Sequence, residues 1–308
     1  MKFPTSSFLA ALSASAVLSA PLEKKQAVTD LDVLQFALTL EHLENVFYKG
    51  ALSRFTEADF LAAGFTSQYF NNLQFIVSDE EAHVVFLQDA ISAAGGTPVA
   101  ACEYNFPYND IHSFVALGSV LEGVGVAAYL GGAAVISSKD ILASAGAILV
   151  AEGLHQSVQR TSLHQVASAN IAGTAITANS IFTVASAFIA SCPPSNPVLP
   201  FQAFSSLVPT QANPNSIQTL TTFTIGQGVI IPPTFFVTFI SGLDVISVPG
   251  THQGGVVSAT IPVIAQGQTY AFVTNTDISG AFVESAVLAG PAILEVTPSA
   301  PTFDLTLL

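Results

Sequence analysis

The chain repeats one order of metal-ligating residues twice. In each half, a Glu that has a Tyr seven residues later precedes a Glu-x-x-His pair. The residues are Glu41, Tyr48, Glu80 and His83 in the first half, and Glu122, Tyr129, Glu152 and His155 in the second. On four helices the order becomes Glu, Glu-x-x-His, Glu, Glu-x-x-His, which is the ligand order of a carboxylate-bridged dinuclear metal site in a four-helix bundle. The repeat therefore predicts a fold and a metal site together.

The surroundings of two of these Glu favour burial. Glu122 is the only charged residue in the stretch 114–138, and Glu152 stands alone between positions 140 and 155. A buried carboxylate is costly unless it is paired or bound to metal. Four Glu and two neutral His supply four negative charges, which two divalent metals balance; without metal, some carboxylates would hold protons. His and carboxylate ligands are compatible with Fe or Mn, and the pattern does not choose between them.

Some ligand assignments have competitors. Glu44 competes with Glu41 in the first helix, where both could also form a solvated face; we prefer Glu41 because its spacing to Tyr48 recurs in the second half. Glu80 lies in the acidic run 79–81, and only its spacing to a His separates it from plain surface charge. The other His of the helical region lack such partners and are expected at the surface or behind the ligands: His42, His112 and His164.

The fold class expected for residues 29–191 is mainly α. Apolar residues at helical spacing predict five helices, at about 30–48, 67–94, 111–136, 138–169 and 175–190. A Pro- and aromatic-rich stretch at 101–110 joins the second helix to the third. Two helical hairpins with a long crossover give a ferritin-like four-helix bundle, to which the fifth helix is added.

The pattern changes after the last helix. Residues 192–214 are rich in Pro and are expected to form a linker. In residues 215–308, short β-branched and aromatic runs separated by Gly, Pro and Asn predict a small antiparallel β-sandwich. The runs are 220–225, 234–240, 256–263, 269–274 and 292–296, and Pro232-Pro233 marks an edge or a bend. Asp244 and His252 are expected to be ordinary loop residues, because no metal or nucleophile motif surrounds them.

Composition excludes some partners. Only 9% of the residues are charged and the net charge is −14 at pH 7. No Lys or Arg follows Arg160. A surface so poor in cations cannot neutralise phosphates, so binding to nucleic acid or to an anionic membrane is not expected.

The N-terminus has the pattern of a secretory signal. A basic start precedes an apolar run at residues 8–20 with small residues near its end. We expect a signal peptide at residues 1–20 and a secreted protein, extracellular or in the cell wall, with no membrane association after signal removal. An uncleaved anchor is the alternative, and the apolar helix at 111–136 is long enough to be read as a membrane span.

The only two cysteines are Cys102 and Cys192. An even pair in an exported chain favours one disulfide, here between segments outside the helical patterns. Two unpaired thiols are the alternative.

Four segments carry a resemblance to a known family. Residues 38–48, 79–83, 121–131 and 152–155 resemble the secreted ferritin-like domain proteins of fungi, which are associated with stress response and late sexual development and are related to plant desiccation-related proteins. The resemblance covers residues 29 to about 190 and implies a ferritin-like fold with six metal ligands. These would be Glu41, Glu80, His83, Glu122, Glu152 and His155. Gly153 departs from the pattern, since a larger residue is more usual beside such a pair.

Three functions are compatible with these features. The first is a di-iron or di-manganese protein that acts on O₂ or peroxide, with Tyr48 and Tyr129 hydrogen-bonded to the bridging carboxylates. The second is a non-catalytic secreted protein of stress or development, in which the metal is structural and the apolar surface binds the cell wall or other copies of the chain. Iron storage in a cage is the weakest, because the β domain would obstruct shell packing.

Overall fold

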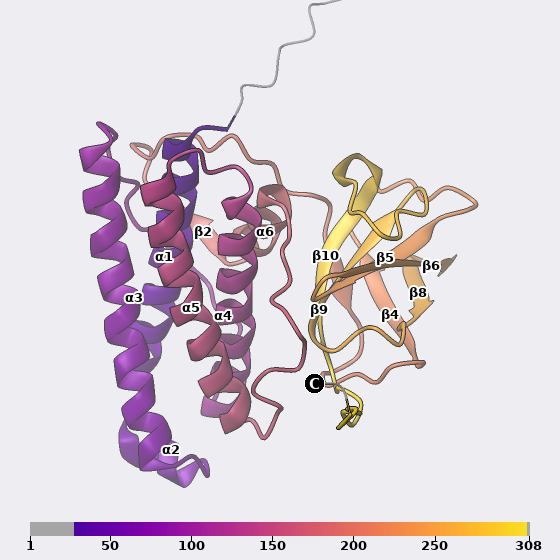
Figure 1. Ribbon diagram of the computed structural model, residues 1–308, viewed down its shortest axis with the longest axis horizontal. Helices are drawn as coiled ribbons and strands as arrows, with labels where there is room; N and C mark the ends of the chain where they lie inside the picture. Colours follow the sequence, from indigo (N-terminus) through magenta and orange to yellow (C-terminus); the bar gives the residue numbers. More distant parts are fainter. Residues whose placement is uncertain (1–27, 307–308) are drawn as a thin grey trace, which may run out of the picture.

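The computed structural model describes residues 28–306. The expected signal peptide at residues 1–20 lies outside this range. A helical region comes first and a β region with antiparallel sheets follows it, as the sequence predicts (Figure 1).

Four long helices run alongside one another in the helical region (Figure 1). The first packs against the second of the four, and the third packs against the fourth, so neighbours in sequence pair in space. Their bounds are α1 Asp30–Leu52, α3 Ser67–Ala93, α4 Ile111–Ala133 and α5 Lys139–Ser162. All four lie close to the predicted ranges.

Local sequence explains where α1 begins. The Thr29 side chain accepts a hydrogen bond from the Asp32 backbone N–H, and the Asp32 carboxylate accepts one in return from the Thr29 N–H. This reciprocal cap satisfies N–H groups that the first helical turn leaves free. Asp30 accepts hydrogen bonds from the N–H groups of Ser137 and Ser138, which ties the start of α1 to the turn between α4 and α5.

Two helices are shorter than expected, and one was not predicted. α5 ends at Ser162 rather than near residue 169, because His164 adopts a left-handed backbone with φ of 59°. A helix that ends at a left-handed residue usually has glycine there. Because position 164 is a His, the sequence carried no signal for the end of α5. The fifth helix, α6, covers only Ala178–Ser186, and a short α2 at Glu57–Ala62 precedes α3.

By length and composition, α4 and α5 could each cross a membrane. More than half of the most apolar stretch of α4 is buried inside the protein, which fits a core helix. The corresponding stretch of α5 is mostly open on its outer side. The protein therefore uses the apolar character of α4 for packing.

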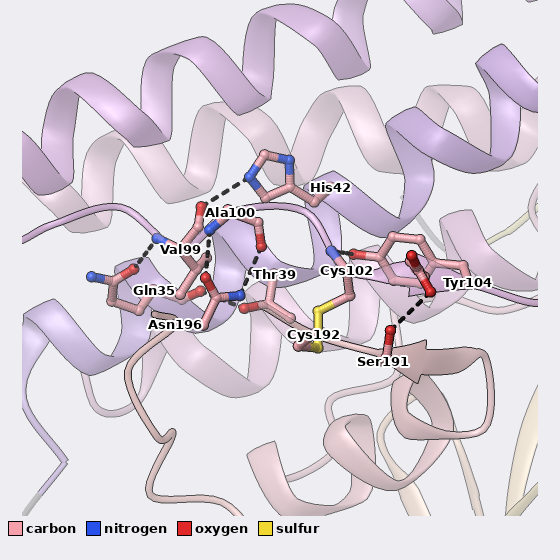
Figure 2. The surroundings of a disulfide bond; sticks show 11 residues. Gln35, Thr39, His42, Val99, Ala100, Cys102, Tyr104, Ser191, Cys192 and Asn196 are labelled. Atoms are coloured by element: carbon pink, nitrogen blue, oxygen red, sulfur yellow. Dashed lines mark hydrogen bonds between the residues drawn. A yellow bond between two sulfur atoms is a disulfide. The ribbon is translucent and has the colours of Figure 1, made fainter. Parts of the chain in front are cut away.

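A disulfide fixes the crossover between α3 and α4 (Figure 2). Cys102 is bonded to Cys192 across 90 positions of sequence, as predicted. Beside it, β1 (Glu103–Tyr104) pairs with β2 (Ile189–Ser191). His42 is not at the surface: it is buried, and its Nε2 lies 3.1 Å from the Val99 carbonyl oxygen of the crossover.

The β region consists of two four-stranded antiparallel sheets. One has the order β10-β9-β5-β6 and the other β3-β4-β8-β7. β3 lies within the range expected to be a linker, and β6 and β7 were not predicted, so Asp244 and His252 lie on strands rather than in loops. The bounds are β3 Leu207–Pro209, β4 Leu220–Ile225, β5 Phe236–Ser241, β6 Asp244–Pro249, β7 Thr251–Gln253, β8 Val256–Thr260, β9 Gly267–Thr274 and β10 Val287–Val296.

The two inner strands of one sheet, β5 and β9, are buried on both faces. Val237 and Phe239 pack between the two sheets, whereas Tyr270 and Phe272 join the apolar core of the helices. A strand buried on both faces lacks a regular apolar–polar alternation, and polar residues of β5 and β9 such as Thr238 and Thr269 are themselves buried. The β region is thereby docked firmly on the helical region.

Candidate metal centre

The structure brings the six predicted ligands together inside the helical region. The ligand atoms form two groups, and within each group they all lie within 4.8 Å of one another. We call each group a half-site. All four Glu are at most 1% exposed, and the two His are nearly buried. The groups are Glu41, Glu80, His83 and Glu152, and Glu80, Glu122, Glu152 and His155.

Two carboxylates belong to both groups. Glu80 on α3 and Glu152 on α5 are each fully buried and lie between the two half-sites. Glu41 and His83 complete one half-site, and the corresponding pair on α4 and α5 completes the other. A Glu from each of two helices and a Glu-x-x-His pair from each of the other two is the set that would hold two metal ions in a bundle of this kind.

Both His present Nδ1 to the carboxylates. The Nδ1 atom of His83 lies 3.2 Å from Glu41 and 3.4 Å from Glu80. The Nδ1 atom of His155 lies 2.9 Å from Glu80 and 3.3 Å from Glu122. Because each His follows its Glu by three positions, one helical face supplies both side chains.

The two Tyr hydrogen-bond carboxylates that belong to only one ligand group each, and not the shared carboxylates as expected. They do so crosswise between the two halves of the chain. The Tyr48 hydroxyl of α1 donates to Glu122 of α4, and the Tyr129 hydroxyl of α4 donates to Glu41 of α1 at 2.5 Å. Each Tyr therefore fixes the Glu of the other half. Gln159, fully buried, extends the first of these contacts, since its Nε2 donates to the Tyr48 hydroxyl at 3.0 Å.

Asp79 is a residue of the site that the sequence reading missed. Its carboxylate lies 3.2 Å from Nε2 of His155, on the ring edge opposite the ligand nitrogen. A carboxylate there fixes the tautomer and the orientation of a ligating His. Asp79 directly precedes Glu80, but only the packing of α3 on α5 reveals its partner.

Glu44 is also buried, so the first helix has no solvated acidic face. It lies across from Gly125 of α4: a Cβ atom at Gly125 would be 2.0 Å from Glu152 Oε2 and 3.4 Å from Glu44 Oε1. Any side chain at Gly125 would displace Glu152. Glu44 belongs to neither group of ligand atoms, whereas Glu41 belongs to one.

Gly153 leaves α5 continuous, because the helix runs through it from Lys139 to Ser162. A Cβ atom at this position would meet no atom within 4 Å. The departure from the usual pattern therefore creates open space beside the site and does not distort the Glu152–His155 pair.

Charge in the metal-free cluster is shared between carboxylates and imidazoles. Burial and the neighbouring Glu80 raise the pKa of Glu41 to about 8. Burial also acts to raise the pKa of Glu80, but His155 and His83 hold it at about 2. Burial acts to lower the pKa values of the two His, yet the carboxylates around them raise these to about 10 for His83 and about 11 for His155. Both His are therefore protonated at neutral pH until metal displaces the protons.

The donor set fits two metal ions. Both carboxylate oxygens of Glu80 and of Glu152, one oxygen of Glu122 and Nδ1 of His155 are buried without a hydrogen-bond partner among the described residues. The close contacts between them are ion-pair contacts that lack hydrogen-bond geometry. Buried polar atoms rarely lack a hydrogen-bond partner, and bound cations would provide a partner for all of these atoms at once.

A family model described as the ferritin-like domain matches residues 29–165. This range runs from the cap of α1 to just beyond α5 and contains all six predicted ligands. No curated protein matches the chain. The match supports a ferritin-like domain over these residues, and the β region lies outside it.

Proposed function

We propose that this protein is a secreted ferritin-like metalloprotein that holds two Fe or Mn ions and acts on O₂ or peroxide. The observation that carries the proposal is the pair of ligand groups that share Glu80 and Glu152. Glu41, His83, Glu122 and His155 are the proposed terminal ligands. Two metals held by shared carboxylates supply a two-electron exchange with O₂ or peroxide that side chains alone do not provide.

The protein's own residues would hold this centre rigid and dry. Tyr48 and Tyr129 donate hydrogen bonds to Glu122 and Glu41, which orients each terminal carboxylate. Asp79 orients the His155 ring. The burial of all four Glu excludes bulk water, and in such surroundings electrostatic interactions are stronger than at the surface.

Secretion is part of the proposal. The signal-like pattern at residues 1–20 supports it, and so does the disulfide between Cys102 and Cys192, because such bonds persist in oxidising compartments. The resemblance to secreted fungal proteins of stress response and sexual development supports a role in one of those processes.

Oxidation of Fe(II) by the purified protein tests the proposed activity. We expect the metal-loaded chain to consume H₂O₂ or O₂ as it oxidises Fe(II), and the Glu80→Ala variant to lose this activity because both half-sites lose an oxygen donor. Glu81→Ala is the matched control, since Glu81 is exposed and pairs with Lys49 at the surface. Equal rates in both variants would contradict a reaction at this centre.

A non-catalytic role is the second candidate, and the outer surface favours it. Phe75 on α3 and Val150 and Leu154 on α5 are each more than 60% exposed. Apolar side chains of this size on a surface can mark contacts with another copy of the chain or with the cell wall. A metal-loaded protein that is inert toward O₂ and peroxide but self-associates, and that loses this association in Phe75→Ser, would support the structural role.

A further inference from the structure

An apolar pocket lies at one end of the helical region. It occupies about 460 Å³ at the end where α1 and α5 begin and α3 and α4 end. Small-molecule sites typically have volumes of roughly 300–1,000 Å³. The pocket is therefore large enough for a ligand and does not resemble a packing defect.

The floor of the pocket is one helical turn from the metal centre. Ala37, Leu87 and Ile148 line it, and they lie four residues from Glu41, His83 and Glu152 on their respective helices. The lining also includes Tyr129, whose hydroxyl donates to Glu41. The inner end of a molecule in the pocket would therefore contact Tyr129, which is hydrogen-bonded to a proposed metal ligand.

The lining selects against charge. Asp140, exposed at the outer end, is the only charged residue that lines the pocket within residues 28–306. A carboxylate or phosphate bound inside would have no cationic partner, and an unpaired buried ion is costly. A cationic ligand would find only this outer carboxylate, far from the floor.

We propose that this pocket binds an uncharged aliphatic molecule, such as a medium-chain alcohol, with its inner end beside Tyr129. This binding is independent of the proposed function. The shape and polarity of the pocket account for the binding without metal.

Calorimetric titration of the full chain with 1-decanol and with decanoate at pH 7 tests the proposal. We expect one 1-decanol site per chain, with decanoate at least about tenfold weaker because its carboxylate has no partner. Ala145→Phe fills the pocket from α5, and its matched control is Ala143→Phe, which lies on the exposed side of the same helix.

Ala145→Phe is expected to weaken 1-decanol binding about tenfold or more, and Ala143→Phe to leave it within about twofold. Ala90→Phe, which fills the pocket from α3, gives the same loss if Ala145→Phe does not fold. Absence of 1-decanol binding, equal binding by pocket and control variants, or decanoate binding as tight as that of 1-decanol would overturn the proposal.

Metal analysis of the same samples separates the two proposals. A chain that binds 1-decanol in the pocket but takes up no metal supports the pocket and refutes the metalloprotein. A chain that takes up metal but not 1-decanol refutes the pocket alone.

Discussion

Glu122 is the sharpest single-residue test of the centre. It is fully buried in the most apolar helix, where it accepts from Tyr48 and faces Nδ1 of His155. Glu122→Gln keeps the volume but removes the charge, so we expect loss of at least one metal per chain. The metal-free variant should be as stable as the parent within about 1 kcal/mol, or more stable, because a buried carboxylate has been removed.

Elemental analysis and chemical denaturation of the two metal-free proteins would measure both effects. Two metals still bound by the Glu122→Gln variant would contradict a ligand role for Glu122.

Glu41 and Glu44 differ in what they touch. Glu41 belongs to one ligand group, where it contacts His83, and it also accepts a hydrogen bond from Tyr129. Glu44 lies outside both groups, beside Glu152. We therefore expect a large loss of metal in Glu41→Ala and little in Glu44→Ala, measured as metals bound per chain. The opposite result would move the α1 ligand to Glu44 and leave the fold intact.

Metal uptake should release protons at pH 7. The pKa values of His83 and His155 are raised to about 10 and about 11, so both imidazoles carry protons that bound metal must displace. Protons compete with metal for the imidazole nitrogens, and they compete more strongly at lower pH. The affinity for metal should therefore rise with pH across the range 6 to 8. Mn(II) titrations in two buffers of different ionisation enthalpy would measure the release. Affinity independent of pH would contradict this protonation state.

At the scale of elements, the crossover between α3 and α4 depends on the disulfide. The bond closes a loop of 90 positions, and His42 and Gln35 of α1 contact the neighbouring crossover segment at Val99 (Figure 2). Replacement of both Cys by Ser should lower the unfolding free energy by about 3–5 kcal/mol, since the unfolded chain is less restricted. Thermal unfolding of the double variant beside the parent measures this.

Thiol titration in denaturant provides the control for that experiment. Two free thiols in the parent protein, measured without reductant, would show that the bond does not form.

Elements with a regular period were predictable, and those set by distant contacts were not. The apolar spacing locates α1, and β4 at Leu220–Ile225 matches its predicted range. The end of α5 depends on a left-handed His164, for which the sequence carries no glycine signal. Edge strands as short as β7 contain too few residues for a period to emerge.

For the site, the two Glu-x-x-His pairs together with the repeated Glu–Tyr spacing identified six residues that converge. Asp79 and Gln159 were missed because their partners, His155 and Tyr48, lie 76 and 111 positions away. Contacts at such separations follow from helix packing, which no local pattern encodes. The ligand role of the six residues stays a prediction until metal is measured.

At the scale of the whole molecule, the β region contacts the helix that carries Glu122. The Tyr270 hydroxyl donates to the carbonyl oxygen of Gly123 at 3.0 Å, and a Cβ atom at Gly123 would lie 2.2 Å from Gln268. Arg160 of α5, nearly fully buried, forms a two-point ion pair with Glu295 of β10. The β region thus braces α4 and α5 close to the proposed centre.

The metal content of the purified full chain tests the central claim most directly. Six converging ligands with four carboxylates should hold close to two transition-metal ions per chain, because two divalent ions balance the four negative charges. The account predicts about two Fe or Mn per chain by elemental analysis, as isolated or after anaerobic loading with Fe(II) or Mn(II). No bound metal after both loadings would contradict it.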